Sequence, residues 1–212
     1  MFNQYILSEN NILLLCGVAG GGKTELGNLY MKFLLKSSLF REKIESSPDE
    51  SLDIKVAYIK NEKILSTDQF WLTLQEDRYD LVFLDDLDYG LLPRTQEISS
   101  SEDIDKNKFI SNLLSFTDGI FESSQTTKFI ITTNREVGDI DSAILRKGRT
   151  FDILNLRPLT NKESKKIWTS NGLSSELFED TFGHKKEILA CDLGSEISDV
   201  KAQEKFKKGR NP

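Results

Sequence analysis

The sequence predicts a three-layer α/β/α fold with a five-stranded parallel sheet, followed by a small helical lid. Short apolar runs alternate with helical patterns over residues 11–154, which is typical of a parallel sheet covered by helices on both faces. After Pro158 only helical patterns continue. At 212 residues the chain is long enough to bury such a core. We therefore expect an α/β domain over residues 1–158 and a lid with a basic C-terminal tail over residues 159–212.

Each strand is predicted from a short apolar run. These runs cover residues 11–16, 54–59, 79–84, 128–133 and 151–154. The third contains the uninterrupted run LVFL, which suits a parallel strand covered on both faces.

The helices are predicted from apolar periodicity. The first begins after a glycine-rich stretch, and Leu26, Leu29, Tyr30, Phe33 and Leu34 recur in it at the spacing of one buried face. Further helices are expected over residues 67–75, with Asp68 as a cap, and over residues 108–116. The lid helices are expected over residues 160–168, 174–181 and 195–206. Residues 89–106 are polar and serine-rich, which favours a surface loop.

Composition excludes several classes of function. The net charge of -6 gives no overall attraction to nucleic acid. The sequence has no 18-residue apolar run and no signal-peptide pattern at its start, so we expect a cytoplasmic protein that no membrane holds. Cys16 and Cys191 belong to no paired motif, which predicts free thiols. His184 is the single histidine, which disfavours histidine-rich metal sites, and we expect it at the surface.

The stretch GVAGGGKT, residues 17–24, fits the phosphate-binding pattern GxxxxGK[ST] between a strand and a helix. Its glycines leave backbone N–H groups free to surround phosphate oxygens, and the helix dipole points to the same place. Lys23 would reach the β- and γ-phosphates of a nucleotide, and the Thr24 hydroxyl would bind Mg²⁺. The nucleotide-contacting residues expected here are Gly17, Val18, Ala19, Gly20, Gly21, Gly22, Lys23, Thr24 and Glu25.

An acidic pair follows the third predicted strand, in the run LVFLDD. Ligands bind at the carboxyl edge of open parallel sheets, so this pair is expected beside the glycine-rich loop. Asp85 is then the carboxylate on the Mg²⁺ side, and Asp86 is the one that activates water.

A longer stretch resembles a known family. Residues 132–160, TTNREVGDIDSAILRKGRTFDILNLRPLT, look like the second region of homology of the AAA clade of AAA+ ATPases. DLGSEISD, residues 192–199, is similar to the lid-helix segment that packs beside the base in this clade, which implies nucleotide contacts for Gly194 and Ser195. The resemblance extends over residues 11–207 and implies ATP and Mg²⁺ as ligands and hydrolysis of ATP to ADP and phosphate.

The resemblance also assigns catalytic roles. Asn134 matches sensor 1, which orients the attacking water. Arg149 matches the arginine finger that reaches the γ-phosphate held by a neighbouring subunit, and Arg146 is the second candidate. A finger supplied in trans can raise the rate by about 10³ to 10⁵. This implies a homo-oligomer, a ring for which a hexamer is one candidate size.

Four departures from the family pattern bear on activity. Asp86 stands where most of the clade has Glu, and Ile153 follows Phe-Asp where a second arginine is usual. Only ten residues precede the first strand, without the segment that normally closes over the adenine. Residues 60–75 contain no aromatic-glycine pair of the kind that grips substrate in a ring's pore, and Phe70 and Trp71 are expected in the core.

Three functions remain open at this point. The first is an oligomeric ATPase that remodels a protein or nucleoprotein partner. The second is an ATPase of the helicase-loader or replication-initiation type, which the double aspartate of LVFLDDLD and the missing pore motif favour. The third is a nucleotide-binding switch with little turnover, which Asp86 and the absent second arginine suggest. A small-molecule kinase would share the glycine-rich loop but leave residues 134–149 unexplained.

Overall fold

The computed structural model describes residues 2–37, 54–94, 100–117 and 127–208, and the chain forms two compact units. The sheet unit comprises Met1–Gly17 and Lys23–Asn155. The helical unit comprises Val18–Gly22 and Leu156–Pro212. The glycine-rich loop therefore divides between the two units at Gly17 and Lys23.

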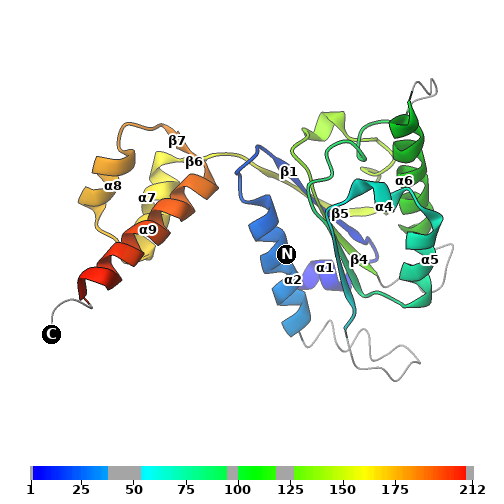
Figure 1. The fold of residues 1–212 in the computed structure, drawn as a ribbon, viewed down its shortest axis with the longest axis horizontal. Coiled ribbons are helices and arrows are strands. Elements are labelled where there is room, and N and C mark those ends of the chain that lie inside the picture. The colour runs from blue at the N-terminus through cyan, green and yellow to red at the C-terminus, as the bar shows by residue number, and fades with distance from the viewer. Residues whose placement is uncertain (1, 38–53, 95–99, 118–126, 209–212) are drawn as a thin grey trace. The chain divides into compact units, whose positions relative to one another are not determined.

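The sheet unit contains the predicted five-stranded parallel sheet, in the order β2-β3-β4-β1-β5 (Figure 1). Its strands are β1 (Ile12–Gly17), β2 (Val56–Ile59), β3 (Leu81–Leu84), β4 (Lys128–Thr132) and β5 (Thr150–Leu156). All residues of β3 and β4 are buried, as expected for central strands covered on both faces. β1 pairs with β4, which in turn pairs with β3, so the carboxyl ends of these strands meet at one edge.

Helices cover both faces of this sheet. On one face lie α1 (Phe2–Leu7) and α2 (Lys23–Lys36), and on the other lie α5 (Asp68–Glu76) and α6 (Ser101–Thr117) (Figure 1). The short helix α4 (Glu62–Leu65), which the sequence did not predict, precedes α5, and the 3-10 turn η2 (Val137–Asp139) follows β4. The prediction of Asp68 as a cap is wrong by one residue, since Thr67 is the N-cap and Asp68 begins the helix.

Residues 2–11, which precede β1, connect to the amino edge of the sheet by hydrogen bonds. The Tyr5 hydroxyl donates to the carbonyl oxygens of Asn11 and Phe129 at 2.8 and 2.9 Å. The ammonium group of Lys128, a fully buried residue, donates to the carbonyl oxygen of Ser8 at 2.7 Å. α1 therefore lies at the edge opposite the carboxyl ends of the strands.

The buried face of α2 differs from the predicted one. Tyr30 and Leu34 are fully buried, but Leu29 and Phe33 are 55% and 37% exposed. The reason is Gly27, where an added Cβ would lie 2.5 Å from Cζ of Phe83 on β3. Because glycine has no side chain, α2 can approach the sheet most closely on the face that carries Gly27. Hydrophobic periodicity does not predict this contact, since glycine does not count as an apolar residue in the pattern.

α6 begins earlier than predicted. The sequence favoured a loop through residue 106, but the helix starts at Ser101. The Ser100 hydroxyl accepts a hydrogen bond from the Asp103 amide at 3.2 Å, which is N-capping by the serine itself. The acidic residues of the first turn also interact favourably with the helix dipole.

Aromatic residues fill the core between the sheet and the helices α5 and α6. Phe70 and Trp71 are 9% and 7% exposed, which confirms the prediction that they are core residues. Trp71 packs against Phe109, Phe116 and Phe129, with ring centroids 5.6–6.4 Å apart.

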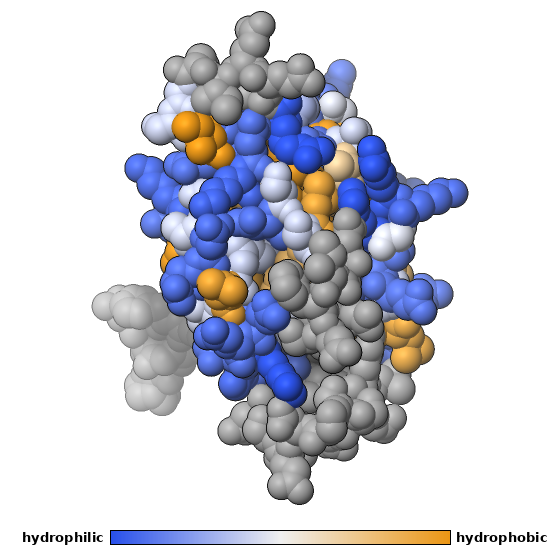
Figure 2. Space-filling model, turned by 90° about the vertical axis from the view of Figure 1, so that its right-hand side faces the viewer, coloured by the Kyte–Doolittle hydropathy of each residue, from blue (hydrophilic) through white to orange (hydrophobic). Residues whose placement is uncertain are grey.

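On the face of the molecule seen in Figure 2, isolated hydrophobic side chains lie among hydrophilic ones.

The helical unit contains α7 (Asn161–Ser170), α8 (Ser175–Phe182) and α9 (Ala190–Lys208). It also contains an antiparallel pair of short strands, β6 (Leu159–Thr160) and β7 (Glu187–Ile188), so the prediction of helices alone after Pro158 is wrong. Two-residue strands are too short to leave a periodic pattern.

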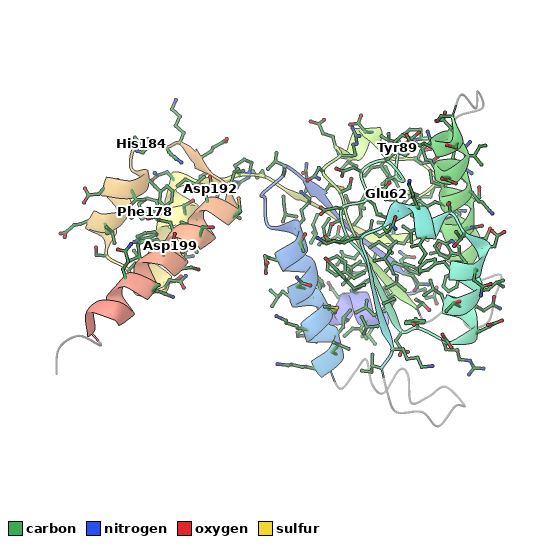
Figure 3. The ribbon with its side chains drawn as sticks, viewed as in Figure 1. Glu62, Tyr89, Phe178, His184, Asp192 and Asp199 are labelled. Carbon is green, nitrogen blue, oxygen red and sulfur yellow. The ribbon has the colours of Figure 1, made fainter. Side chains whose placement is uncertain are left out.

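The helical unit has its own core, formed around Trp168, Phe178 and Phe182, whose ring centroids lie 5.7–6.0 Å apart (Figure 3). His184 is exposed on the loop after α8, as predicted. The side chains of the expected basic tail, from residue 204 on, lie outside the described residues. Among the described residues, no helix is both long and apolar enough to cross a membrane.

Candidate functional site

Four residues singled out in the sequence meet at the carboxyl edge of the sheet. Lys23 and Thr24 begin α2, directly after the glycine-rich loop that ends β1. Asp85 follows β3, and Asn134 lies two residues after β4. Since β3, β4 and β1 are adjacent and in parallel register, their carboxyl ends bring these side chains together in two hydrogen-bonded pairs, Lys23 with Asn134 and Thr24 with Asp85.

Asp85 is the buried centre of one cluster of hydrogen bonds. Its Oδ1 accepts from the hydroxyls of Thr24 and Thr132 at 2.9 and 2.7 Å, and its Oδ2 accepts from the Tyr58 hydroxyl at 2.7 Å. The Lys60 ammonium lies 3.3 Å from Oδ2. Burial alone would raise the pKa of Asp85, but the hydrogen bonds, led by Tyr58 and Thr132, outweigh it and lower that pKa. The carboxylate is thus held ionised without exposure to bulk water.

Lys23 belongs to a second cluster. Its Nζ donates to the carbonyl oxygen of Gly17 at 2.9 Å and to Oδ1 of Asn134 at 2.7 Å. Burial lowers the pKa of Lys23, while the nearby charges of Asp86 and Asp88 act in the opposite direction. The ammonium group of Lys23 is therefore held by one backbone carbonyl oxygen and one side-chain amide oxygen.

Asp88 holds the other end of Asn134. Its Oδ2 accepts from the Asn134 side-chain amide at 2.8 Å, and its Oδ1 accepts from the Asn134 backbone amide at 2.6 Å and the Thr133 hydroxyl at 3.0 Å. Burial would raise the pKa of Asp88, but these bonds, with the Asn134 side chain foremost, lower it. This residue lies in the acidic run LDDLD, but no role was predicted for it.

Asp86 has an unusual backbone. Its φ is 61°, in the left-handed region, and its amide donates to Thr132 Oγ1 at 2.8 Å. Asp is one of the few residue types enriched at such angles, which gives a backbone reason for Asp rather than Glu at this position. The carboxylate is 52% exposed and lies 3.8 Å from the Lys60 ammonium.

The glycine-rich loop contains glycines in conformations that other residues rarely adopt. Gly20 and Gly22 have φ of 75° and 88°, where a side chain is strained. Within the helical unit, the carbonyl oxygen of Gly20 accepts from the Cys191 amide at 3.1 Å, and an added Cβ on Gly20 would lie 2.7 Å from Cys191 Sγ. Glycine is therefore required at this point both by the turn and by the approach of α9.

The other predicted nucleotide contacts, except Gly21, lie at the surface. Val18, Ala19 and Glu25 are exposed, and Gly21 is buried, its amide donating to the carbonyl oxygen of Val18. Gly194 and Ser195 are exposed on α9, with open space at Gly194.

The two candidate arginine fingers differ in their surroundings. The guanidinium group of Arg149 donates to the carbonyl oxygen of Ala143 at 2.7 Å, and the residue is half-buried. Arg146 is exposed. Arg149 thus already stabilises its own loop, while Arg146 presents its side chain to solvent.

The residues present fit Mg²⁺ and a nucleotide triphosphate. The Asp85 carboxylate and the Thr24 hydroxyl are 2.9 Å apart, and such oxygen atoms are the ligands that Mg²⁺ takes beside phosphates. A loop with φ-positive glycines precedes Lys23, which supplies the cation that phosphates require. No group of three or more His, Cys, Asp or Glu side chains placed to hold a metal occurs among the described residues.

The parallel sheet, the glycine-rich loop before α2 and the acidic strand end define the P-loop nucleotide-binding class of α/β proteins. A family model described as "ATPase family associated with various cellular activities (AAA)" matches residues 13–158, more than half of the chain. The chain belongs to this AAA family. Comparison with curated proteins gives no match.

Several residues of the site were not found from the sequence. Tyr58 and Lys60 reach Asp85 from the end of β2, Thr132 reaches it from the end of β4, and Asp88 reaches Asn134. Their common signal is position, because each stands at or just after the carboxyl end of a strand. Which of these residues touch depends on the order of strands in the sheet, and that order cannot be read from spacing along the chain.

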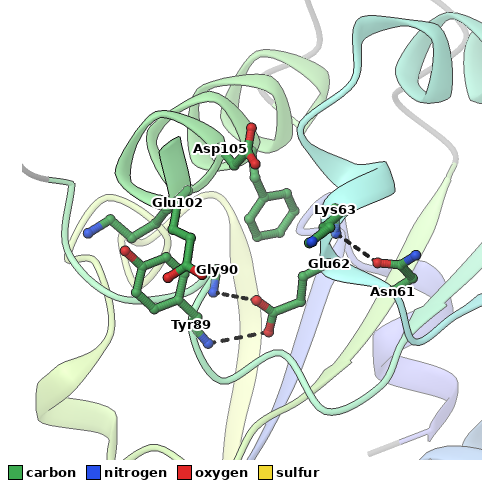
Figure 4. Close-up of a pocket in the computed structure, with 9 residues that line it drawn as sticks. Asn61, Glu62, Lys63, Tyr89, Gly90, Glu102 and Asp105 are labelled. Carbon is green, nitrogen blue, oxygen red and sulfur yellow. Dashed lines mark hydrogen bonds between the residues drawn. The ribbon is translucent and has the colours of Figure 1, made fainter. Parts of the chain in front are cut away.

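A separate cavity of about 390 Å³ lies beside the loop that carries Asp88 (Figure 4). The Glu62 carboxylate of α4 accepts hydrogen bonds there from the backbone amides of Tyr89 and Gly90 at 3.3 and 3.1 Å. The Tyr89 hydroxyl donates to Asp103 on α6 at 3.1 Å. The turn after Asp88 is therefore fixed by two helices.

Proposed function

We propose that this protein binds ATP with Mg²⁺ and hydrolyses it to ADP and phosphate, in an oligomer that remodels a protein or nucleoprotein partner. The observation that carries the first part is the joining of Lys23, Thr24, Asp85 and Asn134 at one sheet edge. Membership of the AAA family supports it.

Each residue has a role that its contacts support. The Lys23 ammonium group would exchange its hydrogen bonds to Gly17 and Asn134 for bonds to the β- and γ-phosphates. Thr24 and Asp85 would hold Mg²⁺. When bound, Mg²⁺ supplies positive charge to the phosphate oxygens. Asp86 is the exposed carboxylate that takes the proton of the attacking water, which Asn134 orients. Arg149 or Arg146 of a neighbouring copy would stabilise the charge that develops on the γ-phosphate.

The test is phosphate release from ATP and Mg²⁺ over a wide range of protein concentrations. It compares wild type, Lys23→Ala, Arg149→Ala, Arg146→Ala and mixtures of Lys23→Ala with each arginine variant. We expect specific activity to rise with concentration, Lys23→Ala to be inactive, and one mixture to regain activity. The regaining mixture identifies the finger, because one mutant keeps a working loop and the other a working arginine.

A specific activity that does not change with protein concentration, together with wild-type rates for both arginine variants, would contradict the oligomeric mechanism.

A nucleotide-binding switch with little turnover is the second candidate. The ion pairs of Lys60 with Asp85 and Asp86 favour it, since they occupy the acidic pair with a cation from the chain itself. Tight ATP binding without phosphate release, restored to turnover by Lys60→Met, would favour the switch.

A further inference from the structure

The Asn134 side chain is held between a donor and an acceptor. Its Oδ1 accepts from the Lys23 ammonium at 2.7 Å, and its Nδ2 donates to Asp88 Oδ2 at 2.8 Å. An ammonium group can only donate and an ionised carboxylate can only accept. The two partners therefore fix which end of the amide is oxygen.

Asp88 is itself held in place from several sides. Its carbonyl oxygen accepts from Arg135 Nε at 3.0 Å, and the preceding Leu87 amide donates to the carbonyl oxygen of Thr132 at 2.9 Å. On its other side, Glu62 accepts from the amides of Tyr89 and Gly90 (Figure 4). A group that must position another needs such support from its own neighbours.

We propose that Asp88 is the positioning residue of the site, which orients Asn134 so that its amide oxygen alone faces Lys23 and the phosphate loop. This inference rests on the proposed function. Asn134 then acts as a hydrogen-bond acceptor, toward Lys23 in the nucleotide-free chain and toward the attacking water in the ATP-bound one. Its NH₂ group is committed to Asp88 and does not donate to the γ-phosphate.

The alternative is a merely structural Asp88 that ties the end of β3 to the end of β4. The bonds to the Asn134 backbone and to Thr133 would serve that purpose alone. Asp88→Asn separates the two roles, because Asn keeps an oxygen for those bonds. Its NH₂ group, however, would face the NH₂ group of Asn134, so that amide would turn its oxygen away from Lys23.

The experiment compares Asp88→Asn, Asn134→Asp and the double variant that exchanges the two residues. In the exchange, the amide introduced at position 88 would donate to the carboxylate introduced at position 134, which would still accept from Lys23. We expect each single substitution to lower kcat by about 10²-fold, the cost of a misplaced group, with a much smaller change in KM. The exchange variant should have a kcat about tenfold higher than that of the better single variant, because the hydrogen bonds return. The recovery should be incomplete, because a negative charge moves toward the phosphates.

A second readout does not depend on turnover. The side-chain ¹⁵N–¹H₂ signals of Asn134 are assigned by their loss in Asn134→Asp. In wild type, the hydrogen bond to the Asp88 carboxylate should shift one of the two amide protons downfield. In Asp88→Asn the same proton should resonate upfield of its wild-type position. Asp139→Asn is the matched control, because Asp139 is exposed on η2, and it should leave kcat and the signals unchanged.

Unchanged kcat and amide signals in Asp88→Asn would overturn the proposal, and so would an exchange variant no better than the single ones. If wild type released no phosphate, the proposed function would fail, while the amide signals would still decide the orientation of Asn134.

Discussion

Gly27 decides which side of α2 faces the sheet. It lies on the same helix face as the buried Tyr30 and Leu34, opposite Phe83. Phe83 is fully buried and packs edge-on against Tyr58 with ring centroids 5.2 Å apart, so it has little room to move.

We predict that Gly27→Ala destabilises the sheet unit. Overpacking costs about 1–3 kcal/mol, which outweighs the roughly 1 kcal/mol that alanine gains over glycine within a helix. Urea unfolding should show a free energy of unfolding lower by about 1 kcal/mol. Gly138→Ala is the control, since nothing lies within 4 Å of its added Cβ. A variant as stable as wild type would mean that Phe83 can shift.

Whether a site residue can be predicted from the sequence depends on whether its neighbours along the chain or its distant contacts define its position. Lys23, Thr24 and Asp85 could be named from the sequence because each follows a strand or loop that its own neighbours reveal, whereas Asn134 was named from the resemblance of residues 132–160 to a known family. Asp88 could not, because its partner stands 46 residues later in the chain and meets it only once β3 and β4 pair. The exposed Leu29 and Phe33 show the same limit, since the periodicity of α2 fits two faces and only Phe83 selects one.

At the scale of elements, the strands were easier to predict than the helix ends. Buried parallel strands are short apolar runs between polar segments, and such runs are plain in the sequence. The start of α6 was hidden because serine and acidic residues suit loops by composition. Only the hydrogen bond that the Asp103 amide donates to the Ser100 hydroxyl turns these residues into a helix cap.

Replacing the cap of α6 gives a prediction about that element. Ser100→Ala removes the acceptor of the Asp103 amide and should lower the free energy of unfolding by about 1 kcal/mol. Ser101→Ala, one residue further on, is the matched control and should stay within about 0.5 kcal/mol of wild type, as surface substitutions do. Equal effects of the two substitutions in thermal or urea unfolding would contradict the cap.

The start of α7 predicts a pH dependence. Glu163 completes a capping box with Thr160, and the hydrogen bond from Arg157, followed by those from Thr160, lowers its pKa from 4.5 to about 2. Because the pKa is lowered on folding, the stabilisation is complete above the unfolded value and is lost as pH falls from 4.5 toward 2.

NMR titration of the Glu163 carboxyl carbon should therefore give a midpoint near 2. Arg157→Ala should move that midpoint upward, and Glu163→Gln should remove this contribution to the pH dependence of stability. A midpoint at 4.5 in wild type would contradict the capping geometry.

At the scale of the whole molecule, two cores of unequal size share one chain. The sheet unit buries Trp71 and the helical unit buries Trp168, and these are the only two tryptophans. A unit of roughly 60 residues buries a smaller fraction of its surface than a larger one and is correspondingly less stable. Each tryptophan therefore reports on its own unit.

We predict two separate unfolding transitions. In Trp71→Phe, the fluorescence of the remaining Trp168 should report the unfolding of the helical unit. In Trp168→Phe, the fluorescence of Trp71 should report the unfolding of the sheet unit. The urea midpoint of the helical unit should be the lower of the two. Each substitution leaves the reported unit unmutated, so the order of midpoints is not an effect of the change itself. Coincident transitions would show that the two units unfold as one.

The strand order also has a consequence for biosynthesis. β1 is the first strand of this sheet to be synthesised, but the two strands that flank it, β4 and β5, follow β2 and β3 in the chain. Until β4 has been made, the run ILLLC therefore lacks both strands that it pairs with in the folded sheet, and such exposed apolar segments promote aggregation. A nascent chain stopped before Lys128 should depend on chaperones, and that dependence should end once β4 has inserted between β1 and β3.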